Sequence, residues 1–325
     1  MGLGEGIIVG LAALHFQPWD RSTWTSWYHY ATFSAVLLVG VELLALIVRR
    51  FEDCWAWAYG GGRIPVRGRW LAELKRKDWA FVLFNKWAVC FVIYHLLGFA
   101  WWCGPSAAEG AGGLLARRLA RLAPTCSDAV ARDAGAGYVL WEAGQATVAN
   151  TLGSLASFFV FYDACYHPFH RFLHVRWMYG FVHKHHHQQM APSRAQTDAV
   201  NVHPFEYLVG EYLHLAAVYL SSALLGPCHG YAIVGFLLFG GIAASLNHTR
   251  FDVTVALPFG LGELYSVRYH DQHHVVPNSN YGQYTMLWDH VTGTFLPHPG
   301  DAACAAGKKK KKGGAAARTK AKKGD

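Results

Sequence analysis

Two short blocks in the C-terminal half of the chain, HKHHH and YHDQHH, contain histidines at the same spacing of i, i+3 and i+4. The residues at this spacing are His183, His186 and His187 in the first block and His270, His273 and His274 in the second. On a helix these offsets bring side chains to one face. Neutral imidazoles that share a face can bind iron, zinc or copper, so the two blocks predict a metal site.

Further histidines extend this pattern. The segment FHRFLH places His170 and His174 four residues apart, and NHTRFD contributes His248. One such pair arises by chance on many helices, whereas the whole set, gathered at the ends of apolar segments, is specific for a metal centre. His185, between the members of the first block, is expected to point away from the ligand face.

The histidine blocks lie beside segments that are apolar enough to cross a membrane. Of the 325 residues, 53% are hydrophobic and only 15% are charged, against about 25% charged residues in soluble domains. A membrane span takes about 20 mostly apolar residues. The candidate spans are residues 30–48, 79–102, about 138–162, 207–225 and 231–246, and the run 7–16 is too short to span. The sequence therefore predicts an all-α fold, a polytopic membrane bundle of about four or five transmembrane helices with a cytosolic helical cap.

The distribution of Lys and Arg predicts the orientation of this bundle. The loop 49–78 contains eight of these residues and the loop 103–134 contains four, so the first loop is expected in the cytosol. Alternation of the spans then places every histidine block on the cytosolic side. The loop 103–134 would be lumenal, where Cys103 and Cys126 could form a disulfide.

Two charged residues, Glu42 and Lys86, are embedded in the first two spans. Each lies about 9–10 Å from the cytosolic end of its span, at 1.5 Å per residue. In an antiparallel helix pair they would be level with each other, which predicts an ion pair. The alternative is that the Lys86 side chain extends to the membrane surface.

The run DACYHPFHRFLH … HKHHH … HPFE … NHTRFD … YHDQHH … WDHVTGTF resembles the fatty acid hydroxylase superfamily, which includes the membrane-bound sterol desaturases, over about residues 155–297. The resemblance implies a histidine-bound dinuclear iron centre that uses O2 to hydroxylate or desaturate lipids. The ligands and catalytic residues that it implies are His170, His174, His183, His186, His187, His248, His270, His273 and His274. Zinc could replace the two iron ions in purified protein.

Other residues match the family's supporting positions. They are Asp163, His203, Glu206, Trp288, Asp289, Gly293 and Thr294. Carboxylates that accept a hydrogen bond from a ligand N–H orient the ring and raise its basicity, and this role is expected of Glu206, Asp289 and Asp163. His203 is either a tenth ligand or, because Pro204 follows it, a structural residue at the entry to the next span.

Each O2 turnover of this kind consumes two external electrons. The chain has no G-x-G-x-x-G motif after a strand and no haem motif, so no bound NAD, flavin or haem is expected. The electrons would come from another protein, which in the resembling family is usually cytochrome b5 with its reductase. The expected partners are therefore this donor and a membrane lipid, with no nucleic acid.

The substrate is less clearly indicated. HPFEYLVGEYL resembles a stretch of the sterol 4-methyl oxidases, but Arg250 in NHTRFD stands where those enzymes have glycine. We expect a sterol-type substrate and a role in sterol biosynthesis. The alternatives are a fatty-acyl or sphingoid-base hydroxylase, an aldehyde or alkyl-lipid oxygenase, a histidine-rich metal transporter, and a catalytically dead scaffold.

The expected organisation is an N-terminal membrane hairpin with a lumenal loop (1–134), a catalytic domain (135–300) and a disordered lysine-rich tail (301–325). The tail is either simply solvated or attracted to anionic lipid headgroups. Its last residues, KKGD, resemble the dilysine retrieval signal of endoplasmic reticulum membrane proteins. This predicts a multi-pass protein of that membrane with a cytosolic active site and C-terminus.

Overall fold

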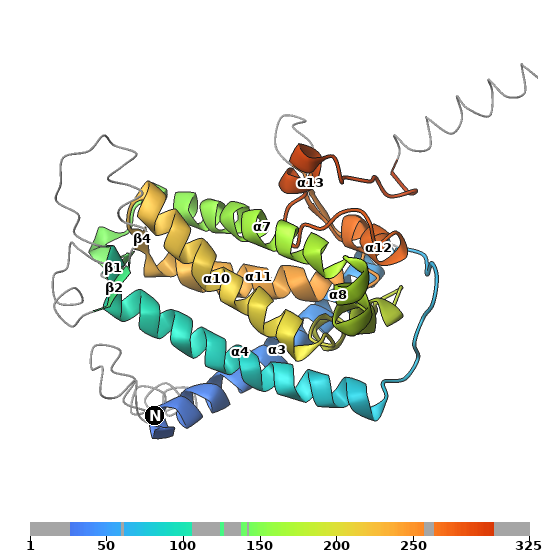
Figure 1. Ribbon diagram of the computed structural model, residues 1–325, viewed down its shortest axis with the longest axis horizontal. Coiled ribbons are helices and arrows are strands. Elements are labelled where there is room, and N and C mark those ends of the chain that lie inside the picture. Colours follow the sequence, from blue (N-terminus) through green and yellow to red (C-terminus); the bar gives the residue numbers. More distant parts are fainter. Residues whose placement is uncertain are drawn as a thin grey trace, which may run out of the picture.

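The chain folds into a bundle of long helices with a cap of short elements at one end (Figure 1). This computed structural model describes residues 27–59, 62–105, 124–126, 138–141, 143–256 and 263–301. The long helices are α3 (Trp27–Tyr59), α4 (Arg76–Trp102), α7 (Ser154–Leu173), α10 (Pro204–Leu225) and α11 (Gly230–Asn247). The expected all-α membrane bundle is confirmed.

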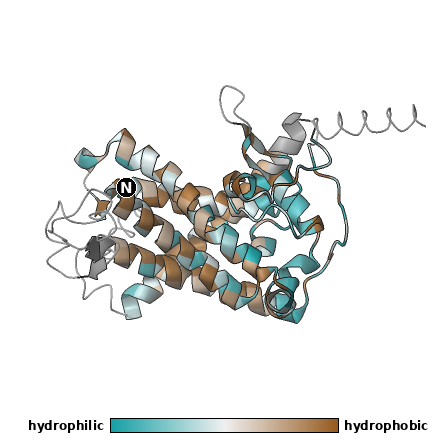
Figure 2. Ribbon diagram, turned by 45° about the horizontal axis from the view of Figure 1, so that its top comes forward, coloured by the Kyte–Doolittle hydropathy of each residue, from teal (hydrophilic) through white to brown (hydrophobic). Residues whose placement is uncertain are grey.

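Four of the long helices can cross a membrane by length and composition. They are Trp27–Phe51, Arg76–Ala100, Pro204–Leu225 and Gly230–Asn247. Their outer surfaces carry exposed side chains such as Ile47, Leu83 and Val234, and Figure 2 shows apolar residues along the length of the bundle. Such a surface is unfavourable in water and favourable in lipid, so the chain is a multi-pass membrane protein.

The third candidate span, 138–162, is wrong in its boundaries. Its first part forms strand β3 (Val139–Leu140) and the 3₁₀ turn η1 (Ala143–Gln145). The helical rod begins with the π-helical turn η2 (Ala149–Gly153) and continues through α7 to Leu173. The apolar start of the segment forms a strand rather than a helix, because β3 pairs in parallel with β4 (Cys228–His229) at the far end of the bundle.

Although α7 is less apolar than the four candidate spans, it connects the two ends of the bundle (Figure 1). From Ala149 to Leu173 the rod is about 37 Å long at 1.5 Å per residue. It packs against α10 and α11. The core between these helices and α4 includes the fully buried side chains of Leu96, Phe158, Ile233 and Phe236.

The cap gathers the segments that follow α7 and α11. It comprises α8 (Arg176–Phe181), the 3₁₀ helix η3 (His183–Gln188), α9 (Gln196–Ala199), the antiparallel strands β5 (Thr254–Ala256) and β6 (Glu263–Ser266), α12 (Val267–Val275) and α13 (Leu287–Thr292). The ends of α3, α7 and α11 and the starts of α4 and α10 meet this cap (Figure 1). All histidine blocks therefore lie at one end of the bundle, as the alternation of spans predicts.

The segment between α3 and α4 lies across the cap. The Ile64 amide donates to the Arg250 carbonyl at 2.8 Å, and the Arg67 guanidinium donates to Asp271 at 2.6 Å and to Gln272 at 2.9 Å. These contacts join the N-terminal helix pair to α12, which carries one of the histidine blocks.

At the opposite end, strand β1 (Cys103–Pro105) pairs antiparallel with β2 (Pro124–Cys126), and the backbones of Cys103 and Cys126 are directly opposed. The disulfide between these residues stays a prediction. The N-terminal run 7–16, most of the loop 103–134 and the lysine-rich tail, with its KKGD ending, lie outside the described residues.

Candidate metal centre

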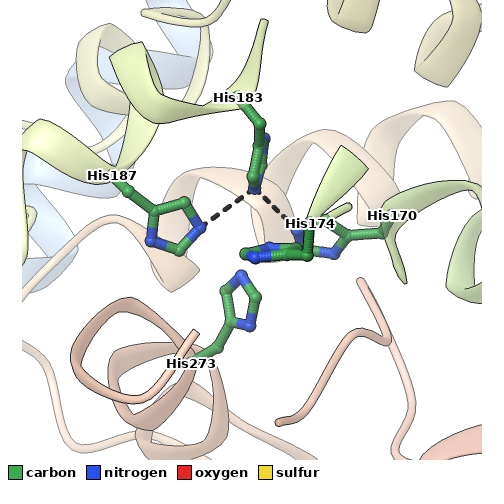
Figure 3. Close-up of side chains that lie close together, drawn as sticks. All are labelled: His170, His174, His183, His187 and His273. Carbon is green, nitrogen blue, oxygen red and sulfur yellow. Dashed lines mark hydrogen bonds between the residues drawn. The ribbon is translucent and has the colours of Figure 1, made fainter. Parts of the chain in front are cut away.

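Nine histidines form two adjacent groups under the cap. The five-histidine group contains His170, His174, His183, His187 and His273 (Figure 3), and the four-histidine group contains His186, His248, His270 and His274. Within each group, one ring nitrogen of every member lies within 4.8 Å of those of all the others. Eight of the nine side chains are buried, and His174 is partly buried.

The two i, i+3, i+4 blocks do not each serve one group. From η3, His183 and His187 join the five-histidine group and His186 joins the other. From α12, His270 and His274 join the four-histidine group and His273 crosses to the first. Each block thus gives its i, i+4 pair to one group and its i+3 member to the neighbouring group. Both blocks therefore contribute to both groups, as expected if two ions are to be held side by side.

The remaining three histidines come from the ends of long helices. His170 lies in the last turn of α7, and His174 is the residue that follows this helix. His248 directly follows α11. Contacts between the groups are close, since ring centroids are 5.0 Å apart for His187 and His274 and 5.7 Å apart for His183 and His186. The two groups are therefore direct neighbours.

Hydrogen bonds to backbone carbonyls fix the proton on the outer nitrogen of several rings. Nδ1 of His170 faces the Tyr281 carbonyl at 2.9 Å, Nδ1 of His273 faces the Ser279 carbonyl at 2.6 Å, and Nδ1 of His248 faces the Ala244 carbonyl at 2.8 Å. A carbonyl only accepts, so each Nδ1 carries the hydrogen and each Nε2 presents a lone pair to its group. Metal ligands are held in this way by their surroundings.

The inward lone pairs fit a cation. Nε2 of His170 lies 3.1 Å from Nε2 of His183, whose own Nδ1 is 2.8 Å from the Glu206 carboxylate. Nε2 of His273 is buried and has no hydrogen-bond partner. Several lone pairs facing one another in a dry site repel, and a metal ion between them removes that repulsion while satisfying every nitrogen. The donor set is entirely imidazole, which suits iron, zinc or copper.

Burial also keeps these imidazoles in the form that binds metal. Desolvation, followed by repulsion from neighbouring imidazoles, holds the pKa of His183, His187 and His274 well below the usual range for histidine. Burial lowers the pKa of His273 to about 4. The rings are therefore neutral at physiological pH and need no deprotonation before a metal binds.

The expected carboxylate contacts hold for one residue and fail for two. Glu206, in the first turn of α10, accepts from His183, and its second oxygen is buried without a hydrogen-bond partner. Asp163 and Asp289 contact none of the nine histidines directly. They bind the loop 279–286 instead, because its backbone presents more N–H donors to them than any imidazole does.

This loop is held from both sides. Asp289 accepts from the amides of Tyr281 and Gly282, each at 2.8 Å, and from the Thr294 hydroxyl at 2.6 Å. Asp163 accepts from the amides of Gln283 at 2.9 Å and of Thr285 at 2.5 Å. The Trp288 indole donates to the Val160 carbonyl at 2.9 Å, and Gly293 ends α13 with a φ of +73°. These residues position the carbonyls that orient His170 and His273.

Three histidines of the sequence motifs, His167, His185 and His203, lie outside both groups. Nδ1 of His203 accepts from the Phe205 amide at 3.2 Å, so this side chain caps the start of α10. His185 faces Asn201 at 3.0 Å and Asp78 at 3.2 Å, away from both groups. His167 contacts Thr294 at 3.1 Å. The structure therefore places His203 at the start of α10 and outside both groups.

Sequence reasoning missed a cluster of charges behind α12. Arg250 is buried, forms an ion pair with Asp271 and donates to the Ile64 carbonyl at 3.0 Å. Asp271 also forms an ion pair with Arg67. The sequence shows Asp271 as a charged residue among the histidines of HDQHH. Its arginine partners, however, lie too far away in the sequence to be predicted from residue spacing.

A cavity of about 510 Å³ lies between α3, α4, α10 and α11 and reaches both histidine groups. Its apolar wall includes Leu37, Val41 and Leu237. His170, His186, His248 and His270 line its inner end. The cavity has the size and character of a site for an apolar small molecule.

The fold and this site define a polytopic membrane protein with a paired all-histidine centre at the end of an apolar cavity. Residues 155–294 match the fatty acid hydroxylase family model, and this region contains all nine grouped histidines. The resemblance stated from the sequence motifs is confirmed.

Curated relatives match part of the chain. The chain is 31% identical over 148 residues to lathosterol oxidase of Rattus norvegicus, covering 45% of this chain and 46% of the relative. It is 32% identical over 139 residues to a Delta(7)-sterol 5(6)-desaturase of Leptosphaeria maculans, covering 42% and 35%. It is 27% identical over 136 residues to a very-long-chain aldehyde decarbonylase of Oryza sativa subsp. japonica, covering 40% and 21%. The match thus spans less than half the length of each of these relatives, and no solved structure matches the chain.

Proposed function

We propose that this protein is an iron- and O2-dependent oxygenase that hydroxylates or desaturates a membrane lipid of sterol type. The observation that carries the proposal is the pair of adjacent histidine groups at the end of an apolar cavity. The similarity to two sterol-oxidising relatives supports a sterol-type substrate. The similarity to an aldehyde decarbonylase keeps aldehyde chemistry as the second candidate.

The nine grouped histidines would hold two iron ions, five ligands on one side and four on the other. The bound iron would supply the activation of O2 that makes an unactivated C–H bond reactive. Neutral imidazoles add no negative charge to offset the charge of the metal ions. The Glu206 carboxylate, which contacts the ligand ring of His183, would offset part of it. The carbonyls of Tyr281 and Ser279 hold the rings of His170 and His273 in their ligand orientation.

The apolar cavity would bind the lipid and keep water from the reacting carbon. Its wall between α3, α4 and α11 is lined mainly by aliphatic side chains, which can bury a hydrocarbon skeleton at about 25 cal/mol per Å². The cavity reaches the bundle end where the histidines lie, so a lipid could enter from the membrane and present one carbon to the metal centre.

The electrons would come from a cytochrome b5-type donor and its reductase at the cytosolic cap. The eight basic residues of the loop 49–78, against four in 103–134, support this orientation. The same topology would expose the lysine-rich segment that contains Lys322 and Lys323 to the cytosol.

Two observations disfavour a non-enzymatic role. A transporter would need ligands near the middle of the membrane, whereas η3 and α12, which carry six of the nine histidines, belong to the cap at one end of the bundle. A dead scaffold would be expected to have lost part of a histidine block, and all of them are complete.

The test is metal analysis together with oxidation of defined lipids. We expect purified full-length protein to bind about two irons per chain, and to convert a Δ7-sterol in an O2-dependent reaction when supplied with cytochrome b5 and its reductase. Octadecanal and a fatty-acyl ceramide are the comparison substrates. Less than one transition-metal ion per chain, with all histidines intact, would contradict the proposal.

A further inference from the structure

Helix α10 contributes ionisable side chains to the wall of the apolar cavity. Glu211 and His214, on this membrane helix, lie beside Tyr284 from the loop 279–286, and all three line the cavity. We refer to Glu211, His214 and Tyr284 as the polar triad. Ionisable side chains within a membrane helix are costly, and those that face a cavity commonly mark a binding site. None of the three belongs to the histidine groups.

The hydrogen bonds of His214 fix which atoms of the triad remain free. Its Nδ1 lies 3.1 Å from the backbone carbonyl of Glu211, which can only accept, so Nδ1 carries the proton. Nε2 therefore presents a lone pair to the Tyr284 hydroxyl at 2.9 Å. Tyr284 must donate its only hydrogen to this nitrogen, and the lone pairs of its oxygen are left to accept.

Glu211 adds a second acceptor. The Glu211 Oε2 atom lies 3.6 Å from Nδ1 of His214, which is too long for a hydrogen bond. The Glu211 side chain keeps 20% of its surface accessible and lines the cavity. The triad thus presents acceptors to the cavity and withholds the Tyr284 and His214 donors from it.

Packing around the triad holds it in place. The ring of Tyr162 lies 4.4 Å from that of His214 and 4.8 Å from that of Tyr284, measured between centroids. A Cβ atom at Gly240 of α11 would lie 2.9 Å from the Tyr284 hydroxyl oxygen. Only glycine leaves room for this hydroxyl where α11 passes it. The loop that carries Tyr284 is itself anchored by Asp163.

We propose that the polar triad binds a hydroxyl group of the lipid substrate, and so determines which carbon reaches the histidine groups. This inference rests on the proposed function. A hydroxyl brings the donor that the Tyr284 oxygen lacks, whereas an aldehyde, ester or ether oxygen only accepts. Along α10, Glu211 and His214 lie about 8 and 12 Å beyond Glu206, at 1.5 Å per residue. The hydroxyl is therefore held at a fixed distance, on the order of 10 Å, from the metal centre.

The test measures binding of paired probes to the full-length protein in detergent micelles, with and without added iron. The pairs are cholesterol with cholesteryl methyl ether, and 1-octadecanol with octadecyl methyl ether. We expect the alcohol of at least one pair to bind about tenfold more tightly than its ether, the effect of one hydrogen bond in a dry site. The pair that shows this preference distinguishes a sterol from a straight-chain lipid.

Tyr284→Phe and Glu211→Met should each bring the alcohol-to-ether ratio towards one. Tyr231→Phe removes the same hydroxyl from an exposed tyrosine on α11 outside the cavity lining, and should leave the ratio unchanged. Iron content shows that each variant is folded, since no triad side chain is a grouped histidine. Equal binding of alcohol and ether by the wild-type protein in both pairs would overturn the hydroxyl site. Loss of iron binding would instead overturn the proposed function and leave the lipid preference measurable.

Discussion

Glu42 of α3 and Lys86 of α4 form an ion pair between two neighbouring membrane helices. The sequence predicted this contact from the equal depth of the two charges in an antiparallel helix pair. The Lys86 side chain is largely covered, with 19% of its surface accessible. The pair therefore replaces the alternative in which Lys86 extends alone to the membrane surface.

Removing one partner should be worse than removing both. Glu42→Gln and Lys86→Gln each leave an unpaired charge at membrane depth, and the double variant leaves none. We expect the double variant to have a higher melting temperature in bicelles than either single variant. Strictly additive changes in a double-mutant cycle would show that the two charges do not couple.

The features that sequence predicted best are those fixed by local periodicity and by membrane thickness. Four spans, the common end of the histidine blocks and the Glu42–Lys86 pair all follow from counting residues along helices. The start of α7 was mispredicted because hydropathy cannot tell an apolar strand pairing, such as β3 with β4, from the first turns of a helix.

Counting residues along helices could not predict how the histidines are divided between the two groups or which residues support them. The spacing of His183, His186 and His187 indicates a shared face, but the exchange of His186 and His273 between groups depends on how η3 and α12 face each other. The pairing of Asp271 with Arg67 joins residues 204 positions apart. Asp289 binds backbone amides rather than a ligand ring. Each of these contacts is set by tertiary packing.

The histidine groups predict which alanine substitutions remove metal. His186→Ala and His273→Ala each delete a nitrogen from a different group, and we expect iron content to fall by about half or more, with loss of lipid oxidation. His185→Ala should keep iron, although it loses contacts to Asn201 and Asp78 and should lower the melting temperature. Iron content measured by mass spectrometry checks all three. Equal iron loss in His185→Ala would contradict the assignment of groups.

The position of His203 makes a separate prediction. Because its side chain caps α10, His203→Ala should destabilise the protein by about 1 kcal/mol and leave iron content unchanged. His203→Asn supplies another capping side chain and should recover most of the stability. A fall in iron in both variants would instead make His203 a tenth ligand.

The ion pair of Arg250 with Asp271 should be important for stability. Both groups are buried, and Arg250→Met removes one of the two arginines that pair with the Asp271 carboxylate, at a cost of about 3 kcal/mol. Arg268→Met, on the helix that carries Asp271, is the matched control, because Arg268 is 28% accessible and its partners Asp252 and Asp301 are partly exposed. It should cost about 1 kcal/mol or less. Chemical denaturation in mild detergent measures both, and similar costs would show that the buried pair has no special role.

The loop 279–286 should control metal affinity without supplying a ligand. A Cβ atom at Gly282 would lie 2.2 Å from the Thr285 carbonyl and 3.0 Å from the Asp289 carboxylate. Gly282→Ala must therefore displace the loop, and with it the carbonyls of Tyr281 and Ser279 that orient His170 and His273. We expect iron affinity to fall about 10–100-fold, as for other changes in the contacts behind metal ligands. Gly180→Ala, in the cap but with nothing within 4 Å of its added Cβ, should bind iron as the wild-type protein does. Competition with a chelator measures the affinity of each variant, and unchanged retention of iron by Gly282→Ala would mean that the nine imidazoles hold their geometry without these two carbonyls.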